Sequence, residues 1–195
     1  MQPQAAAFER ALALHCAPAL AGAAPANLVS LSLREYPDFS RLLQFYGKQL
    51  EQVGAQLFPL CQCHRRVLLL VFRPALLAKA LSPAPVVRCL THCGYPSCGG
   101  IRPLLAELRR RVAAGDGFPH EIGLFLGYPL ADVLGFMALG GDSCRLCGYW
   151  KVYGDVTYAR ECFRRFDQCR NLLCCGLQSG QSLLQLLNGT IQKAA

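Results

Sequence analysis

Two apolar segments joined by a short turn constrain the fold of this chain more than any other feature. Residues 66–72 read RVLLLVF, which is almost wholly large or β-branched and apolar, and residues 56–62 form a second such segment just before them. Cys63, His64 and Arg65 lie between the two as a turn. A strand that is apolar on both faces belongs in the middle of a sheet covered on both sides. We therefore predict a hairpin whose second strand is central.

The flanking segments predict helices and further strands. Residues 27–33 alternate apolar and polar side chains, as in a half-buried strand. Apolar residues at helical spacing predict helices over residues 37–53, 74–81, 102–114, 156–173 and 182–191, and residues 149–153 read as a last strand. Apart from a helical insertion at about 83–142, the order is β-α-β-β-α-β, as in a ferredoxin-like sandwich.

The resulting prediction is an α+β fold in a single domain over residues 1–195. It has a small, mostly antiparallel sheet of about four strands packed with helices. Within the insertion, Pro119 and Pro129 each suit the first position of a short helix. The second of these helices, LADVLGFMAL, is so apolar that we place it in the core.

Hydropathy indicates a folded protein without a membrane span. The chain is 53% hydrophobic and 16% charged, which excludes a disordered class. Its longest purely apolar run, residues 67–72, is too short to cross a bilayer. The charge-free stretch at 11–33 is broken by a histidine and two prolines, and Glu9 beside Arg10 leaves no clean export signal before it. We expect no membrane partner and a cytoplasmic, reducing location.

The net charge of +8 raises the question of an anionic partner. The only run of basic residues, at 109–111, lies at the end of a predicted helix, where cations suit the helix dipole. The two short helices could be read as a helix-turn-helix, but the second carries no Arg, Lys, Asn or Gln to read bases. Nucleic acid is therefore disfavoured, and the partner stays unknown.

Twelve cysteines in a reducing compartment indicate buried thiols, metal ligands or reactive sulfur. Cys144 and Cys147 form the one CxxC motif, which can bind a metal or act as a redox pair. A zinc site needs two further ligands, and no second CxxC supplies them. The candidates are Cys169 with Cys174 or Cys175, or His92 with Cys93. By contrast, Cys162 and Cys169 fall on the apolar stripe of a helix, where packing is the simpler interpretation.

Two histidines stand next to residues that could give them a chemical role. His15 precedes Cys16 in a stretch rich in Ala and Gly that reads as a loop, and a histidine can activate a neighbouring thiol. His120 precedes Glu121, but Leu124 excludes the HExxH zinc motif. The pair either begins a helix, with the carboxylate favoured in its first turn, or serves acid–base chemistry.

The strand at 149–153 offers a surface on which a ligand could stack. Tyr149, Trp150 and Lys151 would supply it, although alternating aromatic residues are also ordinary in strands. Nucleotide-binding loops, the GxSxG motif and the EF-hand loop are absent.

Several blocks of the chain together resemble a bacterial, clostridial-type family known as domain of unknown function 3793. These blocks are HCAPALAG, CGYP, FPHEIGLFLGYPLADVLGF, GYWKVYGD and FDQCR. The resemblance spans nearly the whole chain and implies a self-contained cytoplasmic domain from an anaerobe, with no activity to transfer. The positions that match the family pattern are His15, Cys16, His120, Glu121, Gly127, Pro129, Asp132, Tyr149, Trp150, Lys151 and Tyr153.

Three functional hypotheses follow. The first is a thiol-redox or metal-binding role that uses soft ligands, with Zn or Fe as the metal. Its residues are His15, Cys16, Cys144 and Cys147, with His120 and Glu121 as further carriers. The second is an enzyme in which Cys16 is the nucleophile, His120 the acid or base, and Glu121 or Asp132 its orienting group. The third is a binding module without catalysis, which uses the aromatic strand and the arginine-rich faces.

Overall fold

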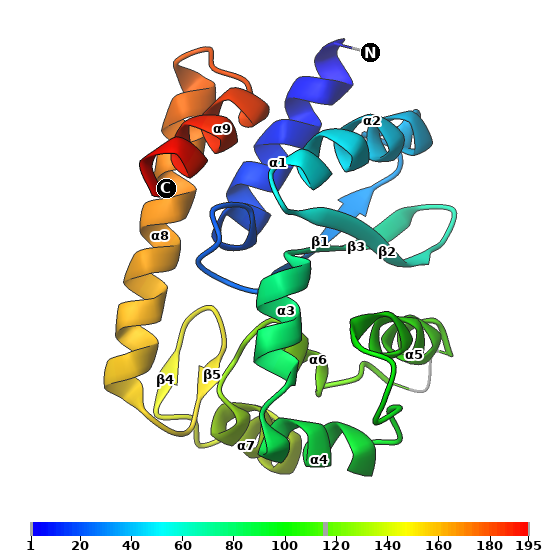
Figure 1. The fold of residues 1–195 in the computed structure, drawn as a ribbon, viewed down its shortest axis with the longest axis vertical. Helices are drawn as coiled ribbons and strands as arrows, with labels where there is room; N and C mark the ends of the chain where they lie inside the picture. Colours follow the sequence, from blue (N-terminus) through cyan, green and yellow to red (C-terminus); the bar gives the residue numbers. More distant parts are fainter. Residues whose placement is uncertain (1, 115–116, 195) are drawn as a thin grey trace.

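A three-stranded antiparallel sheet lies at the centre of the computed structural model, which describes residues 2–114 and 117–194 (Figure 1). The central strand, β3 (Arg66–Phe72), pairs with β1 (Ala26–Ser32) on one side and with β2 (Gln56–Gln62) on the other. The predicted hairpin and its central second strand are confirmed.

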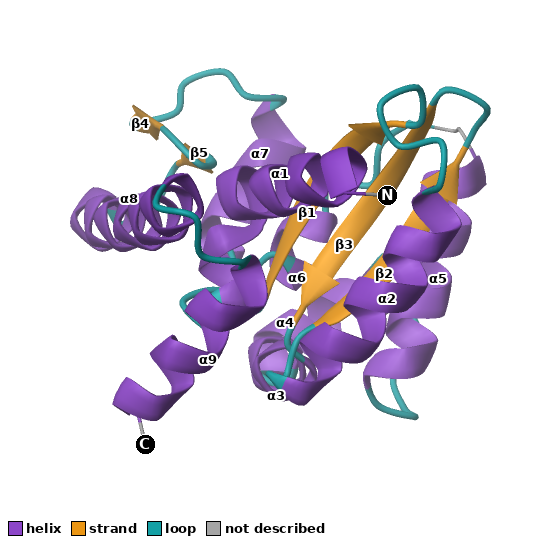
Figure 2. Ribbon diagram, turned by 90° about the horizontal axis from the view of Figure 1, so that it is seen from above, coloured by secondary structure: helices purple, strands orange, loops and turns teal. Residues whose placement is uncertain are grey.

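Helices cover both faces of this sheet, which explains why β3 is apolar from Val67 to Phe72. On one face, Val67, Leu69 and Val71 pack with α1 (Gln2–Leu20) and α2 (Phe39–Gln52). We call this the α1 face, and Figure 2 shows both helices in front of the strands. The same cluster includes residues of the long helix α8 and of α9, whose bounds are Val156–Gln178 and Leu183–Ala194.

The opposite face, which we call the α5 face, receives Leu70 and Phe72 from β3. Its helices come from the segment that follows the sheet in the sequence. They are α3 (Pro74–Leu81), α4 (Ala84–His92), α5 (Ile101–Ala114), α6 (Ile122–Phe125) and α7 (Leu130–Leu139). Alternate residues of one strand therefore stabilise two separate clusters, as the period of a strand requires.

The first helix corrects a sequence prediction. His15 and Cys16 were expected in a loop, but both lie inside α1, which continues to Leu20 and carries Pro18 in its last turns. Alanine is the best helix former, so this Ala-rich segment is helical although it has no polar face. The guanidinium of Arg73 donates hydrogen bonds to the carbonyls of Ala19 and Leu20, which satisfies the end of the helix.

The fourth predicted strand does not join the main sheet. β4 (Leu146–Cys147) and β5 (Lys151–Val152) instead form a separate two-stranded ribbon. The reason is packing, because Trp150 and Val152 belong to a cluster with residues of α8 rather than with the sheet edge. The α+β class with an antiparallel sheet is confirmed, whereas the β-α-β-β-α-β order does not close into one sheet.

The two predicted short helices form as α6 and α7, but α6 begins at Ile122 rather than at Pro119, and α7 is not a core helix. In α7 only Asp132 and Val133 are buried, while Leu134, Met137 and Leu139 are exposed. The helix therefore lies at the surface with one side against the rest of the molecule. Among the described residues, no helix combines the length and the apolar character needed to cross a membrane.

Candidate functional site

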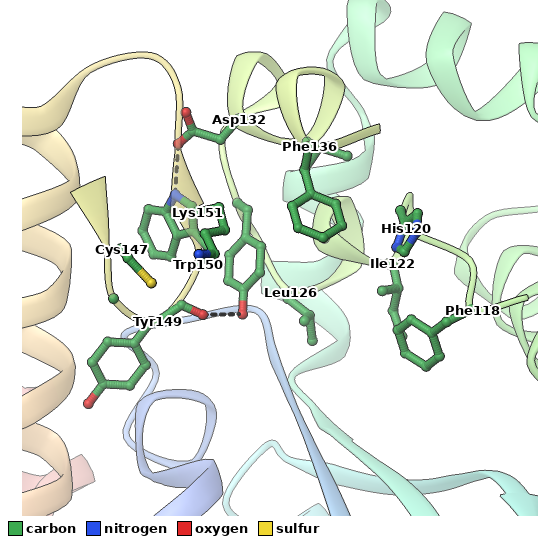
Figure 3. A pocket seen from close by; sticks show the side chains of 14 residues that line it. Phe118, His120, Ile122, Leu126, Asp132, Phe136, Cys147, Tyr149, Trp150 and Lys151 are labelled. Atoms are coloured by element: carbon green, nitrogen blue, oxygen red, sulfur yellow. Dashed lines mark hydrogen bonds between the residues drawn. The ribbon is translucent and has the colours of Figure 1, made fainter. Parts of the chain in front are cut away.

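A pocket of about 430 Å³ lies between the α6–α7 segment and the β4–β5 ribbon. Phe118, His120 and Phe136 line it from the first segment, and Cys147, Trp150 and Lys151 line it from the second. Figure 3 shows Phe118 and His120 on one side and the ribbon residues on the opposite side. Two of the sequence blocks, FPHEIGLFLGYPLADVLGF and GYWKVYGD, therefore meet in one cavity.

Asp132 of α7 joins the two segments. Its carboxylate accepts hydrogen bonds from the indole Nε1 of Trp150 at 2.7 Å, and from the backbone N–H groups of Tyr153 and Gly154 at 2.8 and 2.7 Å. The residue is only 2% exposed, so these donors replace the water that a buried carboxylate would otherwise need. Asp132 thus holds the ribbon in place, and its oxygens are already engaged.

Stacked and edge-on aromatic rings form the walls. Tyr128 stacks on Trp150 with ring centroids 4.8 Å apart, and His120 meets Phe136 edge-to-face at 4.9 Å. The Tyr128 hydroxyl donates to the carbonyl of Tyr149 at 3.3 Å, and burial raises the pKa of Tyr128 to about 12. The Tyr128 phenol is therefore neutral and engaged at neutral pH.

The turn of the ribbon requires glycine at position 148. A Cβ built there would collide with the ring of Phe163 on α8. Because the backbone has to approach that ring closely, glycine lets the turn sit directly against the helix. Tyr149 follows immediately, and its hydroxyl donates to Asp167 of α8 at 2.9 Å. Burial and that bond raise the pKa of Tyr149 to about 12. The ribbon is thereby fixed on both sides.

Three polar side chains of the pocket remain available to a ligand. Within the described part of the chain, no hydrogen bond or ion pair occupies the imidazole of His120. Cys147 is exposed and stands directly across the ribbon from Lys151. Electrostatic interaction with Cys147, then with Cys144, and a hydrogen bond with Cys147 raise the pKa of Lys151, a side chain that already carries a positive charge at neutral pH at its ordinary pKa.

Only some of the predicted site residues reach this pocket. His120, Tyr149, Trp150, Lys151 and Cys147 line it. Cys144 lies just before β4, close enough to act on the charge of Lys151, but it does not line the pocket.

The predicted trio of Cys16, His120 and Glu121 is not assembled. Cys16 is fully buried in the cluster on the α1 face, and burial raises the pKa of its thiol well above the usual range. His15, its neighbour, is exposed. Glu121 is buried on the α5 side, where it accepts hydrogen bonds from the Tyr95 hydroxyl at 3.1 Å and from the Arg111 guanidinium at 3.5 Å. These partners leave Glu121 a role in packing rather than in a site with Cys16.

The metal hypothesis gains no support from the arrangement of donors. Among the described residues, no three His, Cys, Asp or Glu side chains gather into a group that could hold a metal ion. This applies to the predicted set of His15, Cys16, Cys144 and Cys147, and His15 and Cys16 point to opposite environments from one helix. Zn or Fe thus has no assembled ligand set in this part of the chain.

Sequence reasoning missed Phe118 and Phe136 as pocket walls and Asp132 as the partner of Trp150. Phe118 is 48% exposed and lines the pocket with that exposed ring. A signal was present in the sequence, because a lone buried aspartate in an apolar helix requires donors. The next block supplied the Trp150 indole and the glycine-rich backbone that could provide them.

The fold and the pocket define an α+β protein in which two sequence blocks enclose one aromatic cavity. This chain belongs to the family described as "Protein of unknown function (DUF3793)", whose sequence model matches residues 12–187. That range includes every residue that lines the pocket. Searches of curated proteins and of solved structures find no match to the chain.

Proposed function

We propose that this protein binds a small, flat, largely apolar molecule that carries an anionic group. The observation that supports this is the pocket itself, in which aromatic walls surround the polar side chains of His120, Cys147 and Lys151. A cavity of about 430 Å³ falls within the range of small-molecule sites. Such sites combine apolar walls with a few polar groups that orient the ligand.

The walls favour a planar ligand. Phe136 and His120 provide ring surfaces on one side, and the stacked pair of Tyr128 and Trp150 provides them on the other. Aromatic rings attract other π-systems in offset-stacked and edge-on arrangements. A flat conjugated or aromatic body fits this lining better than a branched aliphatic one.

The charges favour an anion. Lys151 lines the pocket, and Asp132, the one carboxylate among the lining residues that the structure describes, is engaged by three donors. An ammonium group can donate to a carboxylate, and an N–H of the His120 imidazole can add a second donor. The net charge of +8 supports attraction of an anion over a longer range.

Trp150 makes the proposal directly testable, because it is the single tryptophan of the chain and lines the pocket. Its fluorescence is to be titrated with 3-benzoylpropionate, which combines an aromatic ketone with a carboxylate, and with the neutral methyl ester of the same compound. We expect a saturable change with the acid, and affinity about fivefold to tenfold lower for the ester, because a charged hydrogen bond is lost.

Two lysine variants distinguish the contribution of the pocket to binding from that of the overall positive charge of the protein. Lys151→Met should weaken binding of 3-benzoylpropionate by about the same factor as esterification. Lys79→Met removes an exposed lysine of α3 that does not line the pocket, and should leave the affinity unchanged. The absence of a saturable change, or equal effects of the two variants, would contradict the proposal.

A further inference from the structure

Resting on this proposed function, we propose that Cys147 is a nucleophile that adds to conjugated carbonyl compounds bound in the pocket. The ligand class is thereby narrowed to flat anions with a carbon–carbon double bond next to a carbonyl group. The addition joins the ligand covalently to the protein, with the Lys151 ammonium beside the reacting sulfur.

The position of Cys147 carries this inference. It is exposed, it lines the pocket, and in the register of the ribbon it pairs directly with Lys151. Cross-strand partners on one face hold their Cβ atoms within about 5.5 Å of each other. The Lys151 ammonium is therefore placed beside the Cys147 sulfur, where it can stabilise negative charge that develops on a bound ligand during addition. The aromatic walls begin next to the same sulfur, because Trp150 and Tyr149 also line the cavity.

Other cysteines lack this combination. Cys16 is fully buried. Cys63 is exposed in the turn between β2 and β3, where backbone N–H groups of Arg65 and Arg66 lower its pKa, but it lines no part of this pocket. Cys144 interacts with the charge of Lys151 without lining the pocket. Among the described residues, Cys147 is the one thiol that both lines this pocket and lies beside the Lys151 ammonium.

The proposed step balances without an oxidant or a second substrate. The Cys147 thiolate attacks the alkene carbon β to the carbonyl group, and a carbon–sulfur bond forms. The π electron pair of the alkene moves toward the carbonyl oxygen to give an enolate. The α-carbon then takes up one proton, so that the proton originally held by the thiol ends on carbon. An adjacent cation stabilises the developing enolate charge.

A matched electrophile tests the step. 3-Benzoylacrylate is the unsaturated counterpart of 3-benzoylpropionate, and the full-length reduced protein is to be treated with it and mapped by mass spectrometry. We expect Cys147 to react at least about tenfold faster than Cys63, because binding holds the alkene close to the sulfur. With acrylamide, which has no aromatic group, this preference should disappear. Cys63 is a demanding reference, because its own pKa is lowered.

Variants assign the reaction to its residues. Cys147→Ser should abolish the preferred adduct and Lys151→Met should slow it. Cys175→Ser, which removes an exposed thiol of α8 that does not line the pocket, should leave it unchanged. If 3-benzoylpropionate binds but 3-benzoylacrylate labels Cys147 no faster than Cys63, the nucleophile inference is wrong while the proposed function stands. If neither compound changes Trp150 fluorescence in a saturable way, the proposed function fails, and this inference fails with it.

Discussion

The α1 face of the sheet and the pocket beside α7 contain the same kinds of residue and use them in opposite ways. On the α1 face, the ring of Phe8 is fully buried and meets Tyr36, Phe39 and Tyr46 at centroid distances of 5.9, 6.4 and 5.1 Å. In the pocket, Phe118 is 48% exposed and Phe136 is partly exposed. The aromatic rings of the α1 face are buried against one another, whereas those of the pocket remain partly exposed to solvent.

The polar groups of the two regions differ in the same way. Glu9 of α1 accepts hydrogen bonds from the Tyr46 hydroxyl at 2.8 Å and from the backbone N–H of Leu183 at 3.0 Å. His120 and Lys151 in the pocket have no comparable structural partners among the residues that the structure describes, apart from the thiols beside Lys151. A cysteine or a charged residue therefore indicates function in this protein only where it makes no structural hydrogen bond and is not packed in the core.

The largest expected effect contrasts one phenylalanine from each region. Phe8→Ala should lower the free energy of unfolding by about 3–5 kcal/mol, because it opens a cavity among three rings. Phe118→Ala should cost less than about 1 kcal/mol, because nearly half of that side chain is already exposed. Urea denaturation measures both. Equal losses would show that Phe118 is a core residue rather than a pocket wall.

Phe118→Ala also has an effect on binding that Phe8→Ala should lack. Removing the Phe118 ring should weaken the affinity for 3-benzoylpropionate by a few fold, because an aromatic contact of about 1 kcal/mol is lost. The affinity is measured through Trp150 fluorescence. An unchanged affinity would place the ligand away from this wall.

A loss of stability smaller than that of Phe8→Ala is expected at Asp132, where the pocket region does contain a fully engaged polar group. Asp132→Ala leaves the Trp150 indole and two backbone N–H groups without their acceptor and should cost about 2–4 kcal/mol. The matched variant Asp142→Ala, at an exposed position just after α7, should change stability by less than about 0.5 kcal/mol. Urea denaturation and the emission maximum of Trp150 measure the outcome. Similar results for the two variants would mean that Asp132 does not hold the ribbon.

A pH-dependent effect is expected at high pH. Because burial raises the pKa of Tyr128 from 10.0 to about 12, the unfolded chain loses this proton first as the pH rises. Stability from Tyr128 is therefore complete below about pH 10 and is lost between about pH 10 and pH 12. Tyr128→Phe, which has no such proton, should show a shallower fall of the urea midpoint over that window. An equally steep fall would assign the effect to other groups.

The fold was predictable where one local signal dominated. The hairpin at β2 and β3 follows from apolar pattern and turn residues, and α3 begins at Pro74 as the helix-starting role of proline suggests. Helix α1 was not predictable in this way, because its alanines carry no amphipathic pattern and Pro18 suggested a break. The β4–β5 ribbon depends on contacts with α8 and α7 that are distant in sequence.

The pocket was predictable only in part, and for a similar reason. Tyr149, Trp150 and Lys151 are adjacent in the chain, so a local pattern predicts that they share one surface. Cys16 and Glu121 were equally conspicuous as residue types, but burial and hydrogen bonding assign them to packing. Whether a polar group is left available depends on tertiary partners, which a single sequence does not reveal.

The central claim is that a flat anion occupies the cavity beside Cys147, and protection of that thiol tests it most directly. The rate of Cys147 alkylation by iodoacetamide is to be measured with and without 3-benzoylpropionate, with Cys63 as the internal reference. At a concentration about ten times the Kd, alkylation of Cys147 should slow about tenfold, because only the unoccupied fraction reacts. The rate at Cys63 should not change. An unchanged rate at Cys147 in the presence of bound ligand would contradict the account.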